Sequence, residues 1–214
     1  MNARDRILGR IRNAQARQAT GAHVETISSH LAQHPRGPLP PSPDDLVSCF
    51  RDRAIKLSSD VLEANDRMEV PALLARYLDE SKLPMHGVCW PSLAELPWNA
   101  AGLEMQSRTA TNEDMVGVTG AFCAIAETGT LMMLSGAETP ATTSLLPETH
   151  VAVVDTRRIV ATMEDAWDLM RKECKQPPRA VNFISGPSRT ADIEQTVTLG
   201  AHGPYRVLLI LAPL

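Results

Sequence analysis

The sequence predicts an α/β fold in which helices cover the faces of a sheet. Three observations lead to this prediction. From about Leu46 onward, strand-length apolar runs alternate with segments of helical periodicity, which is the pattern of an α/β sheet. The 214 residues suffice for one such domain with an appendage. The content of 43% hydrophobic residues is that of a globular protein and excludes disorder of the whole chain.

The N-terminal residues 1–20 are expected to form an amphipathic helical arm. Apolar side chains recur at helical spacing from Ala3 to Ala14, with arginines on the other flank. Residues 21–45 lose this periodicity and contain five prolines within nine positions, which predicts an extended linker. The α/β domain is therefore expected over residues 46–214. A short helix beyond a linker needs a surface to cover its apolar stripe, either on this domain or on a second protein.

The first half of the α/β domain is expected to alternate helices and strands. A helix over Leu46–Lys56 follows Ser42, Pro43 and Asp44, which are residue types that favour helix starts. A strand, a helix with an N-terminal proline, a second strand and a helical turn are then expected over Leu57–Leu62, Pro71–Ser81, Gly87–Trp90 and Ser92–Leu96.

The second half contains the clearest pair of strands. Phe122–Ala126 and Leu131–Leu134 are apolar runs separated by Glu127–Thr130, which predicts a β-hairpin. The later pattern predicts strands and helices in turn over Val151–Asp155, Met163–Lys172, Val181–Ser185, Thr190–Leu199 and Val207–Leu211. Of these, Met163–Lys172 and Thr190–Leu199 are the helices, and Gly200 ends the second one.

Composition and charge exclude several classes of function. The 21 Lys and Arg against 25 Asp and Glu give a net charge of −4, whereas a duplex-binding domain normally has a basic surplus. Nucleic acid is therefore not expected as a partner. No apolar run approaches the roughly 18 residues of a membrane span, and the arginine-rich start lacks the apolar core of a secretory signal. We expect a soluble, cytoplasmic protein.

The four cysteines are scattered along the chain, without a Cys-x-x-Cys pair or a short Cys/His cluster: Cys49, Cys89, Cys123 and Cys174. This spacing is typical of reduced thiols in a cytosolic protein. An iron–sulfur cluster held by one chain usually needs four thiolates in compact runs. We therefore expect this chain to bind no metal and no cofactor of its own.

The break between the two hairpin strands contains an ionisable group and two hydroxyls. One interpretation is a tight turn in which Gly129 supplies a positive φ, the threonines bond to local backbone and Glu127 faces solvent. In the other, Glu127 faces a cleft, where burial raises its pKa and suits it to acid–base or nucleophilic chemistry. Under that hypothesis Thr128, Gly129 and Thr130 are candidate ligand-binding residues.

A hydroxyl-rich loop over residues 139–144 leads through Pro147 to His150, at the start of a predicted strand. Such a loop can hold a polar ligand, although most loops of this composition are solvated connections. His150 is a second candidate catalytic residue beside this loop, while a lone histidine at a strand end is more often structural.

Residues 185–192 run from a predicted strand directly into a predicted helix. Free N–H groups at a helix N-terminus attract carboxylate or phosphate, and Arg189 can add a bidentate contact. The candidate ligand-binding residues of this segment are Gly186, Ser188, Arg189 and Thr190. Alternatively, Ser188 or Thr190 only caps the helix.

The connection Gly200–Pro204 lies at the other end of that predicted helix. About ten helical residues span roughly 15 Å, so His202 is expected to lie far from Arg189. We interpret His202 as structural.

Four ordered segments resemble one known family: AIAETGTLMML, SLLPETHVAVV, FISGPSRTADIE and LGAHGPYRVLLIL. They are similar to the LUD-domain proteins of lactate utilization, of the type called protein C. The resemblance covers roughly residues 114–214 and is looser toward the N-terminus. It implies a Rossmann-like, three-layer α/β/α fold related to the sugar-phosphate isomerase and CoA-transferase group.

The resemblance further implies a role in a bacterial system that, with iron–sulfur partner proteins, oxidises L-lactate to pyruvate. A chain without cluster motifs would act there as a non-redox subunit or as a factor that binds a small carboxylate or other anion. The alternative is a stand-alone enzyme that uses Glu127 for acyl, CoA or sugar-phosphate chemistry. The resemblance assigns no catalytic role to any residue.

Overall fold

The computed structural model describes residues 3–14, 21–39, 41–191, 197–200 and 202–213. The chain divides into two compact units, residues 1–40 and residues 41–214. The first unit contains α1 (Ala3–Ala14), at the position of the expected arm helix, and α2 (Gly21–Gln33). The extended linker expected from residue 21 is therefore wrong as far as residue 33. This stretch has no proline, and Val24, Ile27 and Leu31 stand at helical spacing.

The second unit is built on a sheet of six parallel strands. Their order across the sheet is β1, β12, β7, β4, β2, β3, with the bounds Asp60–Glu63, Arg206–Ala212, Thr149–Asp155, Val116–Thr119, His86–Cys89 and Glu104–Ser107. The neighbouring interior strands β12 and β7 are almost entirely buried, as expected for parallel strands covered on both faces. This confirms the predicted α/β fold.

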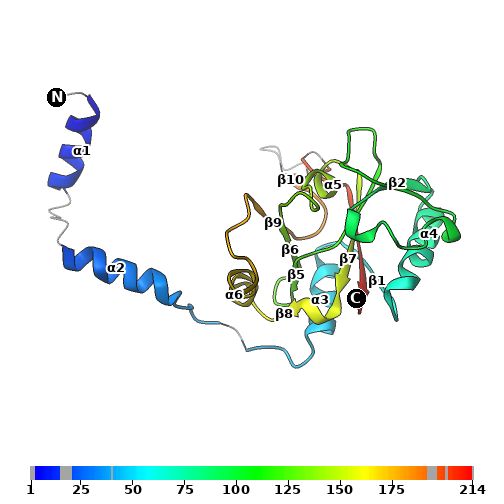
Figure 1. Ribbon diagram of the computed structural model, residues 1–214, viewed down its shortest axis with the longest axis horizontal. Helices are drawn as coiled ribbons and strands as arrows, with labels where there is room; N and C mark the ends of the chain where they lie inside the picture. The colour runs from blue at the N-terminus through cyan, green and yellow to red at the C-terminus, as the bar shows by residue number, and fades with distance from the viewer. Residues whose placement is uncertain (1–2, 15–20, 40, 192–196, 201, 214) are drawn as a thin grey trace. The chain divides into compact units, whose positions relative to one another are not determined.

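Other elements cover both faces of the six-stranded sheet (Figure 1), and each face has its own apolar core. On one face, Val151 and Val153 of β7 pack in a cluster with Leu74 of α4 (Val70–Glu80). On the other face, Ala152 and Val154 pack in a cluster with Phe50 of α3 (Leu46–Lys56). Alternate residues of one strand thus serve opposite faces, as the pleat of a strand requires.

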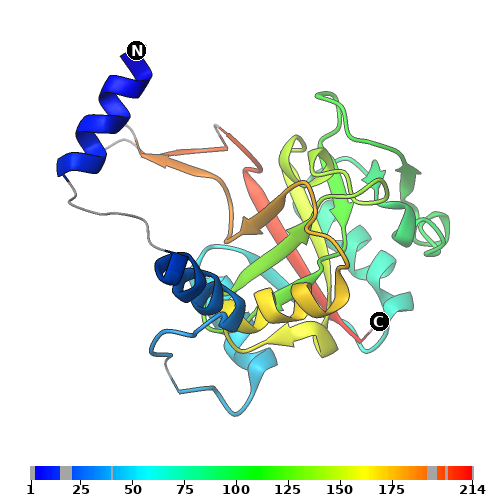
Figure 2. The same ribbon diagram turned by 60° about the vertical axis from the view of Figure 1, so that its left-hand side comes forward.

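A second sheet of four strands joins α3 on that face, in the order β8, β5, β6, β9, with the bounds Ile159–Val160, Cys123–Ile125, Thr130–Leu134 and Val181–Ile184. The strands β5 and β6 pair antiparallel, which confirms the predicted hairpin. The outer face of this sheet is covered by α6 (Met163–Glu173), whose Ala166 and Met170 pack on Ile125 (Figure 2). One face of the main sheet is therefore covered by a helix and a small sheet together.

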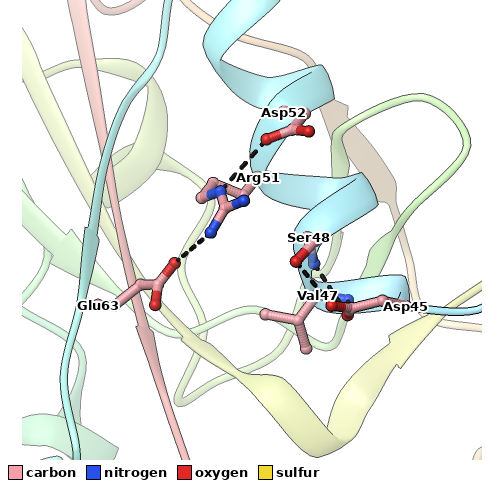
Figure 3. A network of polar contacts seen from close by, with 6 residues as sticks. All are labelled: Asp45, Val47, Ser48, Arg51, Asp52 and Glu63. Carbon is pink, nitrogen blue, oxygen red and sulfur yellow. Dashed lines mark hydrogen bonds and ion pairs between the residues drawn. The ribbon is translucent and has the colours of Figure 1, made fainter.

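The start and the middle of α3 are fixed by short polar contacts (Figure 3). The Asp45 carboxylate accepts hydrogen bonds from the backbone N–H of Val47 at 3.0 Å and of Ser48 at 3.1 Å, which caps the helix. Further along, Arg51 pairs with Glu63 at the end of β1, at 3.0 Å. The cap is thus one residue later than the expected Ser42–Asp44 start, and α3 is joined to the edge strand of the main sheet.

The predicted helix over Thr190–Leu199 is wrong. The described residues there form β10 (Arg189–Ala191) and β11 (Val197–Leu199), which pair antiparallel (Figure 2). The reason lies in the composition, because Thr190, Val197 and Thr198 are β-branched and favour strands over helices. Residues 192–196, with Asp192 and Glu194, lie outside the described part of the chain.

Several elements were not predicted: β3, β4, β8, the short helix α5 (Thr142–Leu145) and the 3₁₀ turns other than that near Ser92. The strand β4 is four residues long and contains Gly117, and β3 is a mostly polar edge strand. Neither has the apolar run by which strands are recognised in a sequence. The remaining predicted elements agree with the structure to within a few residues at their ends.

Candidate functional site

Glu127 lies in the β5–β6 turn and contacts the start of α6. Its Oε1 accepts a hydrogen bond from the backbone N–H of Met163 at 2.9 Å. Met163 is the first residue of α6, directly after the N-cap Thr162, so a carboxylate there stabilises the helix dipole. The half-buried Glu127 therefore has a structural task in this conformation, while its predicted catalytic role stays a prediction.

The neighbouring turn residues pack on the C-terminal part of α3. Gly129 has φ +65°, and a Cβ there would lie 2.6 Å from the backbone nitrogen of Ala54. Gly186 has φ +80°, and its Cβ would lie 2.3 Å from the carbonyl oxygen of Leu57. Both positions require glycine because of this close backbone approach. The two predicted segments around residues 129 and 186 thus do come together, with the C-terminal end of α3.

Hydroxyl groups of the same two segments also bond to each other. Thr130 Oγ1 and Ser185 Oγ lie 2.7 Å apart, which ties the hairpin to the end of β9. Thr128 is exposed, and its carbonyl oxygen accepts a bond from Thr130 Oγ1 at 3.5 Å. The predicted ligand-binding roles of these residues stay predictions.

Arg189 is exposed at the start of β10 and reaches the same end of α3. Its Nη2 donates to the Leu57 carbonyl oxygen at 3.4 Å and to Ser58 Oγ. The strand β10 begins at Arg189, so the expected helix start is wrong, while the predicted ligand-binding roles of Gly186, Ser188 and Arg189 stay predictions. The side chain of Thr190 lies outside the described part of the chain.

The pairing of β10 with β11 also brings the Gly200–Pro204 connection close to Ser188. The Ser188 N–H donates to the Pro204 carbonyl oxygen at 2.9 Å, and Gly203 lies beside the Ser188 side chain. The expectation of a 15 Å separation between the segments of Arg189 and His202 is therefore wrong, because the chain returns as a hairpin. His202 itself is exposed.

His150 is the second residue of β7 and is fully buried. Its Nε2 lies 2.8 Å from Thr119 Oγ1, and its Nδ1 is buried without a hydrogen-bond partner in the described structure. Burial lowers the pKa of the imidazole to about 4, so it is neutral at pH 7. The short helix α5 covers this place, because the Thr143 carbonyl oxygen packs against Gly117, the residue opposite His150 in the sheet.

The three most distinctive polar side chains have different hydrogen-bond partners. Glu127 bonds to the start of α6, His150 of β7 to Thr119 of β4, and Arg189 to the end of α3. Their predicted catalytic and ligand-binding roles stay predictions.

A pocket of about 560 Å³ does lie in the second unit, where two parallel strands end. Trp90 follows β2 directly, Gly120 follows β4, and both line it together with Ala121 and Phe122. Ligands of open parallel sheets bind outside the carboxyl ends of the strands, which is the position of this pocket. It is the natural candidate for a binding site.

The opposite wall comes from the ends of β6 and α6. Leu134 and Ser135 close β6, and Cys174 and Pro178 follow α6. Glu127 stands at the other end of α6, a helix of 11 residues or about 16 Å. The predicted acid–base residue and the pocket are thus separated by the length of this helix.

Arg67 is the charged residue among the described side chains that line this pocket. It lies in a 3₁₀ turn (Arg67–Glu69) that Asp66 caps by accepting a bond from the Met68 N–H at 2.6 Å. Its Nη2 donates to the Ser92 carbonyl oxygen, while its Nε is buried without a partner. Among the described residues no carboxylate forms an ion pair with Arg67.

Residues that line the pocket are neighbours in the sequence of residues around the buried His150. Thr119, the partner of His150, directly precedes Gly120. Thr139 lines the pocket, and the Pro140 carbonyl oxygen accepts a bond from Trp90 Nε1 at 3.3 Å, just before α5. The pocket lining and the surroundings of His150 are thus adjacent along the chain.

Sequence reasoning missed this pocket. Arg67 stands in a segment without a motif, and β4, whose end forms the wall, was not recognised as a strand. Trp90 and Gly120 come together because β2 and β4 are neighbouring parallel strands, and the sequence carries no local signal of that pairing.

The thiols have no partners that indicate a metal centre. All four cysteines are free, and burial raises the pKa of Cys89 and Cys123 to about 11, which keeps both protonated. In the described ranges no three His, Cys, Asp or Glu side chains gather where they could hold a metal ion. No described helix is long and apolar enough to cross a membrane.

Comparison with known proteins finds relatives in sequence and a similar solved structure. The chain is 29% identical over 191 residues to lactate utilization protein C of Bacillus subtilis, with 79% of each chain covered. It is 31% identical over 182 residues to the protein of the same name from Exiguobacterium, again with 79% of each covered. A crystal structure of a duf162 family protein from Deinococcus radiodurans has a TM-score of 0.59 at 21% identity and covers 81% of this chain and 99% of that chain.

The family assignment rests on the α/β domain. The model of the LUD domain matches residues 65–212. This range includes the whole second sheet and every strand of the main sheet except β1. Arg67, Trp90 and Gly120 of the pocket lie within the match. The chain belongs to the LUD domain family.

Proposed function

We propose that this chain is a component of a bacterial system for lactate utilization, in which it acts with iron–sulfur partner proteins that oxidise L-lactate to pyruvate. The observation that carries the proposal is the similarity to proteins named lactate utilization protein C over 79% of both chains. Such coverage concerns the whole fold and not a single motif.

The chain acts in this system as a cytoplasmic, non-redox subunit. Its role is to bind a small carboxylate or other anion, or a surface of a partner. The scattered, free cysteines support this assignment, since electrons would have to pass through clusters on other chains. The pocket at the carboxyl ends of β2 and β4 supports a binding role.

Deletion of the coding sequence tests the proposal. We expect the deletion strain to grow normally on glucose and poorly on L-lactate, and the intact gene to restore growth. Purification of the tagged full chain from lactate-grown cells should also recover two brown iron–sulfur proteins. Normal growth of the deletion strain on L-lactate would contradict the role in lactate utilization.

The stand-alone enzyme is separated from this role by the Glu127→Gln variant. The proposed role predicts that this variant restores growth on L-lactate about as well as the natural chain, since Glu127 contacts α6 and does not line the pocket. Loss of complementation by a folded Glu127→Gln protein would favour acid–base chemistry at Glu127 instead.

A further inference from the structure

We propose that the pocket at the ends of β2 and β4 binds an organic monocarboxylate that is longer than lactate, with its carboxylate at Arg67. This inference deepens the binding role proposed for the pocket, on which it rests, and octanoate binding can fail while the growth test of lactate utilization succeeds. It rests on the charge, the lining and the volume of the pocket.

The charge of the pocket selects one anionic group. Arg67 contributes the positive charge among the described lining residues, and no described carboxylate neutralises it. Among the described contacts only its Nη2 donates a hydrogen bond, to the Ser92 carbonyl oxygen, so other N–H groups of the guanidinium are left to bind a ligand. A planar guanidinium offers parallel N–H donors that match the two oxygens of a carboxylate.

The geometry of Arg67 keeps these donors in place. Its Nη2 is already bonded to the Ser92 carbonyl oxygen, and the turn that carries it is capped by Asp66. The guanidinium is therefore held before a ligand arrives, which reduces the entropy lost on binding. Exposed arginines such as Arg157, which pairs with Asp155 at 3.0 Å, lack this combination.

The rest of the pocket suits an apolar body. Most of its walls are apolar side chains, which include Trp90, Leu93, Phe122, Leu134 and Val153. Its volume of about 560 Å³ lies within the roughly 300–1,000 Å³ of pockets that enclose drug-sized ligands. A three-carbon acid held at Arg67 would leave most of these apolar walls in contact with water.

A chain of methylenes gains affinity from the same walls. Each buried methylene is expected to tighten binding about fourfold. Octanoate has five more carbons than lactate and serves as the probe. We expect it to bind at least about a hundredfold more tightly than L-lactate.

Titration calorimetry of the full chain tests the inference with octanoate, octanamide and L-lactate. Arg67→Gln should weaken octanoate binding by about tenfold to a hundredfold, as expected for loss of a charged hydrogen bond, and leave octanamide unchanged. Arg67→Lys should lie between the two proteins. Arg51→Gln on α3, which removes an arginine outside the pocket, should change nothing.

A second variant keeps the test valid if Arg67→Gln fails to fold. A Cβ at Gly120 meets only ordinary contacts, with the Trp90 ring at 3.9 Å. Gly120→Leu should therefore fill the pocket from its strand wall and abolish octanoate binding. Equal affinities for octanoate and L-lactate, no octanoate binding at millimolar concentration, or full affinity in folded Arg67→Gln would each overturn the inference.

Discussion

Two arginines of the second unit show how differently the fold uses the same side chain. Arg189 stands in a segment rich in glycine, proline and hydroxyls, is exposed, and donates to Leu57 and Ser58 at the end of α3. Arg67 stands in an unremarkable turn, is half-buried, and lines a cavity with an unpartnered Nε. Polar motifs of the sequence thus mark places where the backbone turns and packs, whereas the cavity forms where parallel strands end.

The largest expected difference in the free energy of unfolding is between alanine variants of two glycines, Gly129 in the β5–β6 turn and Gly120 in the pocket wall. A Cβ at Gly129 would meet the backbone of Ala54 at 2.6 Å in a residue of positive φ. Gly129→Ala should therefore lower the free energy of unfolding by about 3 kcal/mol or more, from backbone strain and overpacking together. Denaturant unfolding of the full chain measures this value.

The matched control is Gly120→Ala in the pocket wall, where a Cβ meets nothing closer than 3.9 Å. We expect a change in the free energy of unfolding within about 1 kcal/mol. Similar losses for both alanine variants would contradict the distinction between a packed turn and an open pocket wall.

The buried His150 gives the next effect, on the pH dependence of stability. Its pKa is about 4 in the fold and 6.5 when exposed, so the unfolded chain binds the proton first as the pH falls. The contribution is fully present above pH 6.5 and is lost as the pH falls to about 4, with a total of about 3 kcal/mol. Unfolding free energies across this window measure it.

Nuclear magnetic resonance assigns this pH effect to His150. The His150 ring signals should stay those of a neutral imidazole from pH 8 to pH 5. Asp114 acts in a separate window, since Arg108 lowers its pKa to about 2 and its contribution disappears only as the pH falls from 3.8 toward 2. A His150 signal that titrates near pH 6.5 would contradict the buried, neutral ring.

The smallest expected effect concerns Glu127. Glu127→Ala removes the carboxylate that accepts from the Met163 N–H at the start of α6, and should lower the free energy of unfolding by about 1 kcal/mol. The exposed Glu138→Ala serves as the control and should leave stability unchanged within about 0.5 kcal/mol. Equal stability of Glu127→Ala and the natural chain would remove the structural role of this carboxylate.

The fold could be predicted further than the site. Apolar periodicity indicates the helices α3, α4 and α6 and the buried strands β7 and β12, because their burial requires that pattern. The predicted Thr190–Leu199 helix is wrong because the β-branched residues of this segment favour strands.

The site depends on which strand ends become neighbours, and periodicity does not contain this information. Trp90 and Gly120 lie 30 positions apart in the sequence and meet only because β2 pairs with β4. The Arg67 side chain reaches the same place from a turn before α4. No local motif connects these three residues, so the pocket emerges from the topology of the sheet.

We propose that Arg67, and not the motif-rich segment around Arg189, holds the anionic ligand. Titration of octanoate into Arg67→Gln and Arg189→Gln compares the two arginines directly. We expect a loss of about tenfold to a hundredfold in affinity for Arg67→Gln and natural affinity for Arg189→Gln. Natural affinity in Arg67→Gln together with a loss in Arg189→Gln would contradict it.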